Sequence, residues 1–526
     1  LFEFPDIKTI DLSFELYDDK GRLVKEWEDP KVSVGRPYLI DSRHFQESFF
    51  SPKNYHIPTP FSGSLLIKQK INDLSDAQIF NKLGGFFASA SNYIDYYQEG
   101  SFVTTLHDYS AYLPDQGMNR ACLGLIPAFC DEERETFFIV HAAKAGIGRR
   151  DLKIFLYNAK GEKRITPLPP LPPFGLHKIH LSTLVSDAKE FLGGKSGQIE
   201  IEGIFRQLMT RIAYGVHQKA SGAFSLDHCY YSRLKDAHPL SAVQREKVKK
   251  GYFNPFLILE NEQVTTSVTL FQSEHEPWKK CLDLLIYDEG GKCVFVKPLV
   301  LEMQGNRVET IEMGKVLQGA GISLPFVGHG EVLRHLDSEQ KDYSRDLDLY
   351  LEFRQKNSLA NVIFGSKVWN PPEEIGNKSS LISYGCRVIC DEIHTTYLGI
   401  SNCSYDYDYH LDVQFHLDLV VNGAVAARST LSIGPECTLF KSVEEYFPKA
   451  KEELSRSGGV GLLSYTILNS NYLVTVFLTQ DRKSEALSLE HTVQTPLFPL
   501  IMSNNELSRS SGIPEHLHSE RSVPRV

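Results

Sequence analysis

Apolar and polar residues alternate along four segments of this chain, and each segment ends in a turn. The first places Leu12, Phe14 and Leu16 on one side of the chain, and the same period returns at residues 152–156, 282–286 and 413–419. A period of two over six residues is typical of a half-buried β-strand. We therefore predict one buried set, with alternate neighbours exposed. The buried set is Phe14, Leu16, Ile154, Leu156, Leu284, Ile286, Phe415 and Leu417.

Each alternating run is followed by a turn that contains Gly. The glycines at 21, 161, 291 and 423 lie 140, 130 and 132 residues apart. Recurrence at such a period indicates a repeat architecture. Asp or Asn near Gly supplies the positive φ that a tight hairpin needs. We predict positive φ at Gly21, Gly161 and Gly423, and at Gly290 or Gly291.

Further strands follow each turn, and one of them opens on Gly in three copies, at residues 63–67, 197–201 and 461–465. In the third copy we assign this strand to residues 347–351, which leaves an insertion at 318–346. Helical patterns occur only at 182–191 and 442–455. These features predict a mainly β fold, a tandem array of about four antiparallel β-sandwiches with few short helices. The array resembles immunoglobulin-like and fibronectin-like modules in architecture alone, which implies no function.

The repeat period divides the chain into five parts. Repeat 1 covers 1–112, repeat 2 covers 113–235, repeat 3 covers 236–372 with its insertion, and repeat 4 covers 373–502. Residues 503–526 are rich in Ser, Arg, His, Pro and Glu and should be disordered. Repeat 1 is short at its start, so its opening strand is either missing or supplied from elsewhere. Removal of a targeting segment is a further alternative.

Composition narrows the functional classes. The 526 residues carry a net charge of −10, which argues against a nucleic-acid surface. No stretch of eighteen apolar residues predicts a transmembrane helix. The nine cysteines are odd in number and do not recur between repeats, so we interpret them as free thiols, which favours a reducing, cytoplasmic compartment. The nucleophile elbow, the dinucleotide fingerprint and the CxxC pair are absent, and we expect no cofactor.

A polar element closes every repeat and supplies the candidate site residues. Gln opens it and a His or Trp follows nine to fourteen residues later, with an acid before the His in two copies. The candidate residues are Gln98, His107, Gln218, Asp227, His228, Trp369, Gln480, Glu490 and His491. A carboxylate can fix the tautomer of an imidazole for proton transfer or metal binding. The alternative is that these residues form structural hydrogen bonds, which the Trp in the third copy favours because Trp cannot ligate a metal.

Two functional hypotheses follow. The first is a non-enzymatic array of β-sandwiches that binds a protein or glycan partner. The second is an enzyme or metal-binding protein in which His107, His228 and His491 converge from different repeats. The distance between these imidazoles discriminates the two, because metal ligation needs about 2.0–2.1 Å from each nitrogen.

Overall fold

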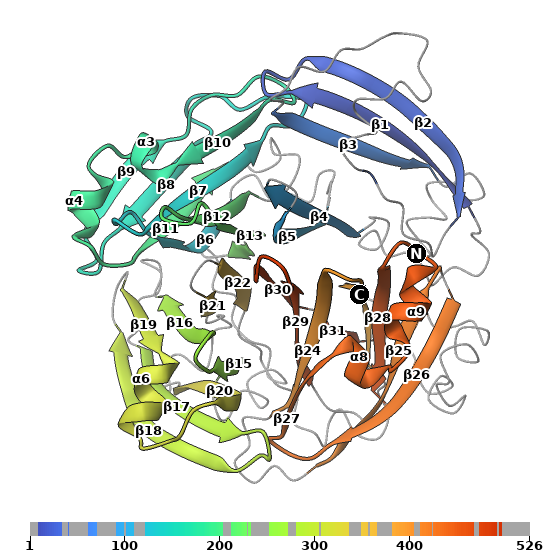
Figure 1. The fold of residues 1–526 in the computed structure, drawn as a ribbon. Coiled ribbons are helices and arrows are strands. Elements are labelled where there is room, and N and C mark those ends of the chain that lie inside the picture. Colours follow the sequence, from blue (N-terminus) through green and yellow to red (C-terminus); the bar gives the residue numbers. More distant parts are fainter. Residues whose placement is uncertain are drawn as a thin grey trace, which may run out of the picture.

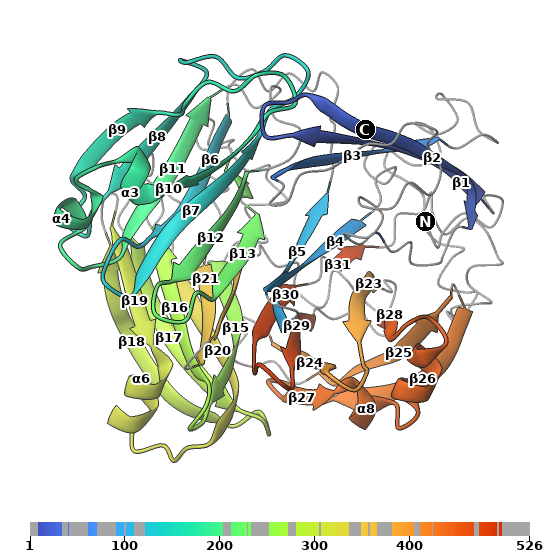
Figure 2. The same ribbon diagram turned by 45° about the horizontal axis from the view of Figure 1, so that its top comes forward.

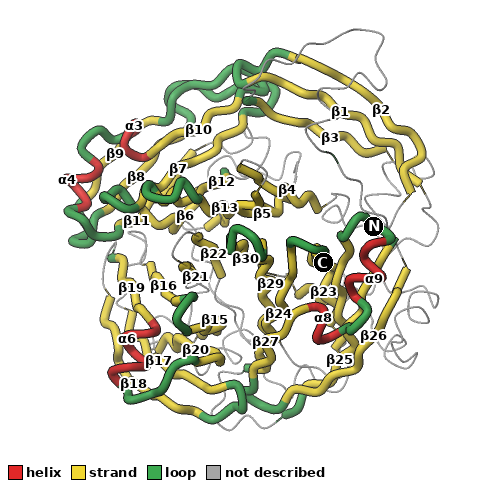
Figure 3. The backbone as a smooth tube through the Cα atoms, viewed as in Figure 1, coloured by secondary structure: helices red, strands yellow, loops and turns green. Residues whose placement is uncertain are grey.

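The computed structural model confirms a mainly β chain built from antiparallel sheets. It describes residues 9–33, 40, 62–70, 91–98, 101–109, 121–203, 212–228, 230–232, 252–271, 280–303, 307–335, 349–355, 358–364, 381–403, 411–422, 424–467, 473–491 and 494–496. Within these ranges the helices are few and short (Figure 3). None of them is long and apolar enough to cross a membrane.

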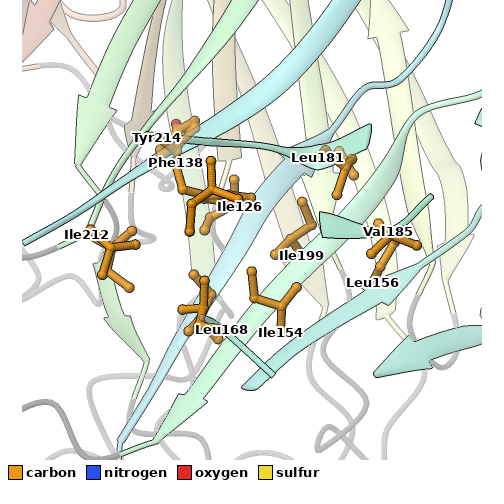
Figure 4. Packing of buried hydrophobic residues seen from close by; sticks show 14 of the residues in the cluster. Ile126, Phe138, Ile154, Leu156, Leu168, Leu181, Val185, Ile199, Ile212 and Tyr214 are labelled. Carbon is orange, nitrogen blue, oxygen red and sulfur yellow. The ribbon is translucent and has the colours of Figure 1, made fainter. Parts of the chain in front are cut away.

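Repeat 2 shows the complete sandwich. One sheet has the order β14-β6-β11-β8-β9 and the other β10-β7-β12-β13. Their bounds are β6 Ala121–Ala128, β7 Arg134–His141, β8 Leu152–Tyr157, β9 Lys163–Pro167, β10 Leu176–His180, β11 Gly197–Gly203, β12 Ala213–Gln218, β13 Phe224–His228 and β14 Tyr230–Ser232, with helices α3 Leu181–Leu184 and α4 Ala188–Leu192. Ile126, Phe138, Ile154 and Ile199 pack between the two sheets (Figure 4).

Repeats 3 and 4 have the same strand order as repeat 2. Repeat 3 pairs β15-β20-β17-β18 with β19-β16-β21-β22, and repeat 4 pairs β26-β25-β28-β23-β31 with β27-β24-β29-β30. The bounds in repeat 3 are β15 Tyr252–Glu260, β16 Thr265–Phe271, β17 Lys280–Asp288, β18 Cys293–Met303, β19 Val308–Glu312, α6 Met313–Gly319, β20 Phe326–His335, β21 Leu349–Gln355 and β22 Ser358–Phe364. Those in repeat 4 are β23 Leu381–Ile389, β24 His394–Asn402, β25 Val413–Val421, β26 Ala424–Ile433, β27 Thr438–Ser442, α8 Val443–Tyr446, α9 Ala450–Ser455, β28 Val460–Ile467, β29 Leu473–Asp481, β30 Leu487–His491 and β31 Gln494–Pro496.

The described strands of repeat 1 match the later strands of the sandwich. They are β1 Thr9–Asp18, β2 Leu23–Ser33, β3 Gly63–Lys70, β4 Ser91–Gln98 and β5 Ser101–Tyr109. The order β2-β1-β3 corresponds to β9-β8-β11 of repeat 2, and the β4–β5 hairpin corresponds to β12–β13. Phe14 and Leu16 of β1 are buried, and Phe14 stacks on Trp27 of β2.

The four repeats are arranged in a ring (Figures 1 and 2). Its centre is made by the last long strand of each repeat, because β5 contacts β13, β13 contacts β22, β22 contacts β30, and β30 contacts β5. The outermost strands in Figure 1 are β2, β9, β18 and β26. Each is the edge strand of its sheet. The ring therefore places these four strands inside and four sheet edges outside.

The turn and core predictions from the alternating runs are confirmed where the structure describes them. Gly21, Gly161 and Gly291 have φ of 76°, 80° and 82°. Gly423 lies outside the described residues. All eight predicted core residues of the four runs are at most 2% exposed. Burying one such large apolar side chain contributes about 1.5–3 kcal/mol before the entropy of ordering it is subtracted.

The expected exposure of the alternate neighbours is wrong at several positions. Tyr157, Asp283, Leu285 and Asp418 are all buried. The reason for the burial in repeats 2 and 3 lies in the ring, where one repeat packs against the next. The core cluster of repeat 2 takes in Phe271, Val308, Tyr350 and Leu359 of repeat 3, and that of repeat 3 takes in Val476, Leu478, Leu487 and Leu489 of repeat 4. A sheet covered on both faces does not show a clean alternation.

The insertion predicted at 318–346 is also wrong. Residues 326–335 form β20, which pairs with β17 so that Asp288 lies opposite Gly328. In repeat 1 the same pairing places Asp18 opposite Gly63. The strand that opens on Gly in the other repeats is therefore β20 in repeat 3. Residues 349–355 instead form the next strand, β21. Its alternating Leu residues resemble the pattern of the Gly-led strand, which is why the sequence suggested the wrong assignment.

Candidate functional sites at the ring centre and the repeat interfaces

The strands that carry the predicted polar elements meet at the centre of the ring. His107 lies on β5, His228 on β13 and His491 on β30, and these strands form part of the closed set of contacts. Gln98 and Gln218 end β4 and β12, Gln480 lies on β29, and Glu490 precedes His491 on β30. Trp369 and the side chains of Gln98, His107, Glu490 and His491 lie outside the described residues. The arrangement brings the backbone of three copies together.

The copy in repeat 2 is buried and bonded within its own hairpin. Asp227 and His228 are 5% and 2% exposed. One oxygen of Asp227 accepts the backbone N–H of His228 at 2.7 Å, and the other accepts the hydroxyl of Tyr214 at 3.4 Å. Gln218 accepts a hydrogen bond from Ser221 at 3.1 Å. These hydrogen bonds lie within the hairpin, and the imidazole of His228 is not presented to solvent.

A second group of polar residues is buried between repeats 3 and 4. His329 and Glu331 on β20 are 0% and 1% exposed, and Glu436, which precedes β27, is 8% exposed. His329 Nε2 lies 3.3 Å from Glu436 Oε2 and 3.8 Å from Glu331 Oε1. One ligand atom from each residue fits within 4.8 Å of the other two. This set is a candidate metal centre because imidazole and carboxylate are ligands of divalent metals.

The local sequence explains how His329 and Glu331 come to face repeat 4. They alternate with Gly328 and Gly330 on β20, so both side chains lie on one face of the strand. The imidazole of His329 stacks on Tyr287 with ring centroids 4.9 Å apart. Its Nδ1 lies 3.0 Å from the hydroxyl of Thr438. The ring is thus fixed by a partner from each repeat, with Nε2 directed at the carboxylates.

Glu436 is held in place by the loop that carries it. Its φ of +55° is in the left-handed region, which is uncommon for a residue other than Gly. Its backbone N–H donates to the carbonyl of Asn402 at 2.7 Å. The side-chain amide of Asn402 donates to the carbonyls of Leu411, Ile433 and Gly434. This loop therefore presents the carboxylate to repeat 3 as a fixed feature.

The electrostatics of this cluster are unusual for a sandwich interface. Burial raises the pKa of Glu331 well above its ordinary value, and the nearby carboxylate of Glu436 raises it further. Oε1 of Glu331 has no hydrogen-bond partner among the described residues. A buried carboxyl group in this state either keeps a proton or needs a cation, because an isolated buried charge is costly.

Two further buried acidic residues lie in repeats 2 and 3. Glu200 on β11 is 0% exposed and is contacted by Gln198 at 3.0 Å and Tyr157 at 3.4 Å. Glu352 on β21 accepts hydrogen bonds from Arg354 and from Tyr350. Both carboxylates accept hydrogen bonds from neighbouring protein groups.

The outer edge strands differ in how they are protected. Among the side chains that the structure describes, each exposes one large apolar residue: Leu23 on β2, Ile165 on β9, Val296 on β18 and Val425 on β26. Pro occurs in β2, β9 and β18, where it removes a backbone donor from the edge. The ten residues of β26 contain no Pro. Its single charged side chain, Arg428, is paired with Asp418 at 2.6 and 2.8 Å.

Sequence reasoning had missed both the buried cluster and the edge. The signal for His329 and Glu331 was their place one and three residues after Gly328, the Gly that pairs with Asp288, and this place becomes visible once β20 is aligned with β11. No local pattern connects them with Glu436, more than one hundred residues away. Comparison with known proteins adds no further guide, since no family model matches the chain and no characterised protein is detectably similar in sequence.

Proposed function

We propose that this chain is a non-enzymatic binding protein that recruits a protein partner at the open edge of β26. The observation that carries the proposal is the contrast between β26 and the other three outer strands. All four occupy equivalent edges of their sheets, yet β26 alone among these described strands lacks Pro. Native edge strands are generally closed by Pro, charge or bulges, because an open edge pairs with other chains.

The chemistry of β26 suits an extended polypeptide. Among the described strands, β26 pairs with β25 alone, so one side of its ten residues, AVAARSTLSI, has no neighbouring described strand. Adding a strand to such an edge uses backbone hydrogen bonds for affinity and alternate side chains for specificity. Val425 is 46% exposed and supplies an apolar contact. A glycan has no backbone ladder to complete, so this edge favours a protein over the glycan partner that the sequence also allowed.

A charge placed on the edge tests the proposal. We would select peptides from a random library on the full chain and measure their affinities for the parent and for Val425→Lys. The expected result is protection of β26 amides from hydrogen exchange in the complex and at least tenfold weaker binding to Val425→Lys. A Lys on an edge strand opposes pairing with a further strand.

The matched control is Val296→Lys on β18, where the same substitution falls on an exposed edge residue beside Pro298. This variant should bind the selected peptides like the parent. Equal affinity for all three proteins, or protection confined to other strands, would contradict the proposal. A glycan array screened in parallel would favour the glycan alternative if it gave specific ligands while the peptide library gave none.

The enzyme or metal-binding alternative rests on the meeting of β5, β13 and β30 at the ring centre. It requires His107, His228 and His491 to share a ligand. In repeat 2 the imidazole of His228 is already buried beside Asp227, which favours the structural interpretation of that copy. Replacing His107, His228 and His491 one at a time and finding equal loss of a single bound ligand would support the shared site instead.

A further inference from the structure

We propose that His329, Glu331 and Glu436 bind one divalent transition-metal ion that ties repeat 3 to repeat 4. The three side chains come from two repeats and are all buried. Imidazole nitrogen with two carboxylate oxygens suits Zn²⁺ or Mn²⁺, whereas Mg²⁺ and Ca²⁺ prefer all-oxygen shells. This site is independent of the binding edge on β26.

The distances within the cluster are close to those of a metal ligand shell. Bonds of about 2.0–2.2 Å place neighbouring ligand atoms about 3.0–3.6 Å apart. Nε2 of His329 lies 3.3 Å from Glu436 Oε2 and 3.8 Å from Glu331 Oε1. One ligand atom from each residue lies within 4.8 Å of the other two, so closing the shell requires the ligands to approach one another by at most about 1 Å. Water or the second oxygen of a carboxylate can occupy the remaining position.

The group behind the imidazole fits a metal ligand. Nδ1 of His329 lies 3.0 Å from Thr438 Oγ1, which is itself 3.0 Å from Ser401 Oγ. When Nδ1–H donates to this hydroxyl, Nε2 keeps its lone pair and faces the two carboxylates. Metal-bound His side chains usually donate their other N–H to such a partner, which fixes the tautomer.

The unpartnered oxygen supplies an independent indication. Glu331 Oε1 is buried and has no hydrogen-bond partner among the described residues, yet it faces His329 Nε2. Buried polar atoms are nearly always satisfied by protein, water or an ion. Two carboxylates and a neutral imidazole carry a charge of −2, which one divalent cation neutralises.

The interface between repeats 1 and 2 shows that the fold does not require these groups. Ser64 pairs across the strands with Tyr17 as His329 pairs with Tyr287. Phe174 lies two residues before Leu176, as Glu436 lies two residues before Thr438. The N–H of Leu176 donates to the carbonyl of Asp19, and the N–H of Thr438 donates to the carbonyl of Glu289.

Phe174 therefore occupies the place of Glu436, and both have positive φ, 57° and 55°. Tyr17 stacks on Phe174 with centroids 4.5 Å apart, and Ser64 donates to its carbonyl. The same docking geometry is thus made with an aromatic ring and a hydroxyl. The ionisable set between repeats 3 and 4 is an addition to the architecture.

Zinc binding to the full chain tests the site. The protein would be stripped with EDTA, returned to chelator-free buffer and titrated with ZnCl₂, and bound metal would be counted by mass spectrometry after gel filtration. The parent should retain one more equivalent of zinc than Glu331→Gln or Glu436→Gln. Its melting temperature should rise with ZnCl₂ and not with MgCl₂, because a ligand of the native state stabilises it.

Glu200→Gln is the matched control. Glu200 occupies on β11 the position that Glu331 occupies on β20, and it is equally buried, but it lies beside Gln198 instead of a His. This variant should keep the full zinc content. Cobalt substitution should give the d–d absorption of a nitrogen and oxygen site without a thiolate charge-transfer band, and Glu331→Gln should lose it.

Two results would overturn the proposal. One is a folded parent that binds no stoichiometric zinc. The other is zinc retained equally by Glu331→Gln, Glu436→Gln and the control, which would place the ion elsewhere. If Glu331→Gln does not fold, Glu436→Gln decides, because its side chain comes from a loop at the border of the cluster and the loop is held through its backbone.

Discussion

Acid should destabilise repeat 2 through the imidazole of His141. This residue ends β7 opposite Leu176 of β10, and its Nε2 is buried with no hydrogen-bond partner among the described residues. Burial lowers the pKa of His141 from 6.5 to about 4. The unfolded chain therefore takes up a proton near pH 6.5 that the folded repeat refuses until about pH 4. The contribution of neutral His141 to the free energy of unfolding is fully present above pH 6.5 and is lost as the pH falls toward 4.

The size of the effect follows from the interval. A fall in pKa from 6.5 to about 4, at about 1.4 kcal/mol for each pH unit, corresponds to about 3 kcal/mol. His141→Gln removes the titrating group and should remove most of this difference. At pH 7, where the imidazole is neutral, the same substitution should change the free energy of unfolding far less.

Hydrogen exchange provides a readout confined to repeat 2, which matters because several packed repeats need not unfold in one step. Opening free energies of the core amides of β7 and β8 would be measured at pH 7 and pH 4.5 for the parent and His141→Gln. The parent should lose stability between these values by clearly more than the variant. An equal loss in both proteins would refute the interpretation of His141 as a buried neutral group.

Two further substitutions test the ring and its polar elements. Gly21→Ala should lower the melting temperature more than Gly194→Ala, although both glycines have positive φ. A Cβ at Gly21 would lie 1.9 Å from the carbonyl of Pro173, whereas one at Gly194 meets nothing within 4 Å. Equal effects in differential scanning calorimetry would show that repeats 1 and 2 do not dock there. His228→Ala should reduce stability while leaving partner binding intact, since this imidazole is 2% exposed; loss of binding in a variant that melts like the parent would move the His and acid pairs to a functional site.

Much of the fold was predictable because the repeated strand pattern is local. Alternation such as that at Leu12, Phe14 and Leu16 identifies one strand in each repeat, and the structure confirms these strands and the glycine turns of repeats 1, 2 and 3. In the third repeat, residues 347–351 were matched with the Gly-led strand of the other repeats, because their alternation is equally regular. Burial of Asp283 and Leu285 was unpredictable from period two, because the next repeat covers that face.

The candidate site was less accessible to sequence reasoning for a physical reason. His329 and Glu331 have no spacing that marks a metal site, and their partner Glu436 arrives only when repeat 4 docks on repeat 3. The position of Glu436 depends on a backbone conformation that local propensity disfavours. The open edge of β26 likewise becomes apparent only by comparison with the proline-containing strands at equivalent places in space.

Contact between β30 and β5 has a consequence for the order in which the molecule assembles. Repeats in an open solenoid meet only sequence neighbours, and such arrays can nucleate anywhere and grow. Here β5 ends at residue 109 and its second neighbour, β30, begins at residue 487. Contacts between segments so far apart in sequence carry a large entropic cost of loop closure, and this cost slows folding. During synthesis β5 of repeat 1 cannot contact β30 until residues 487–491 have been made. We therefore expect chaperones to act on this strand of repeat 1.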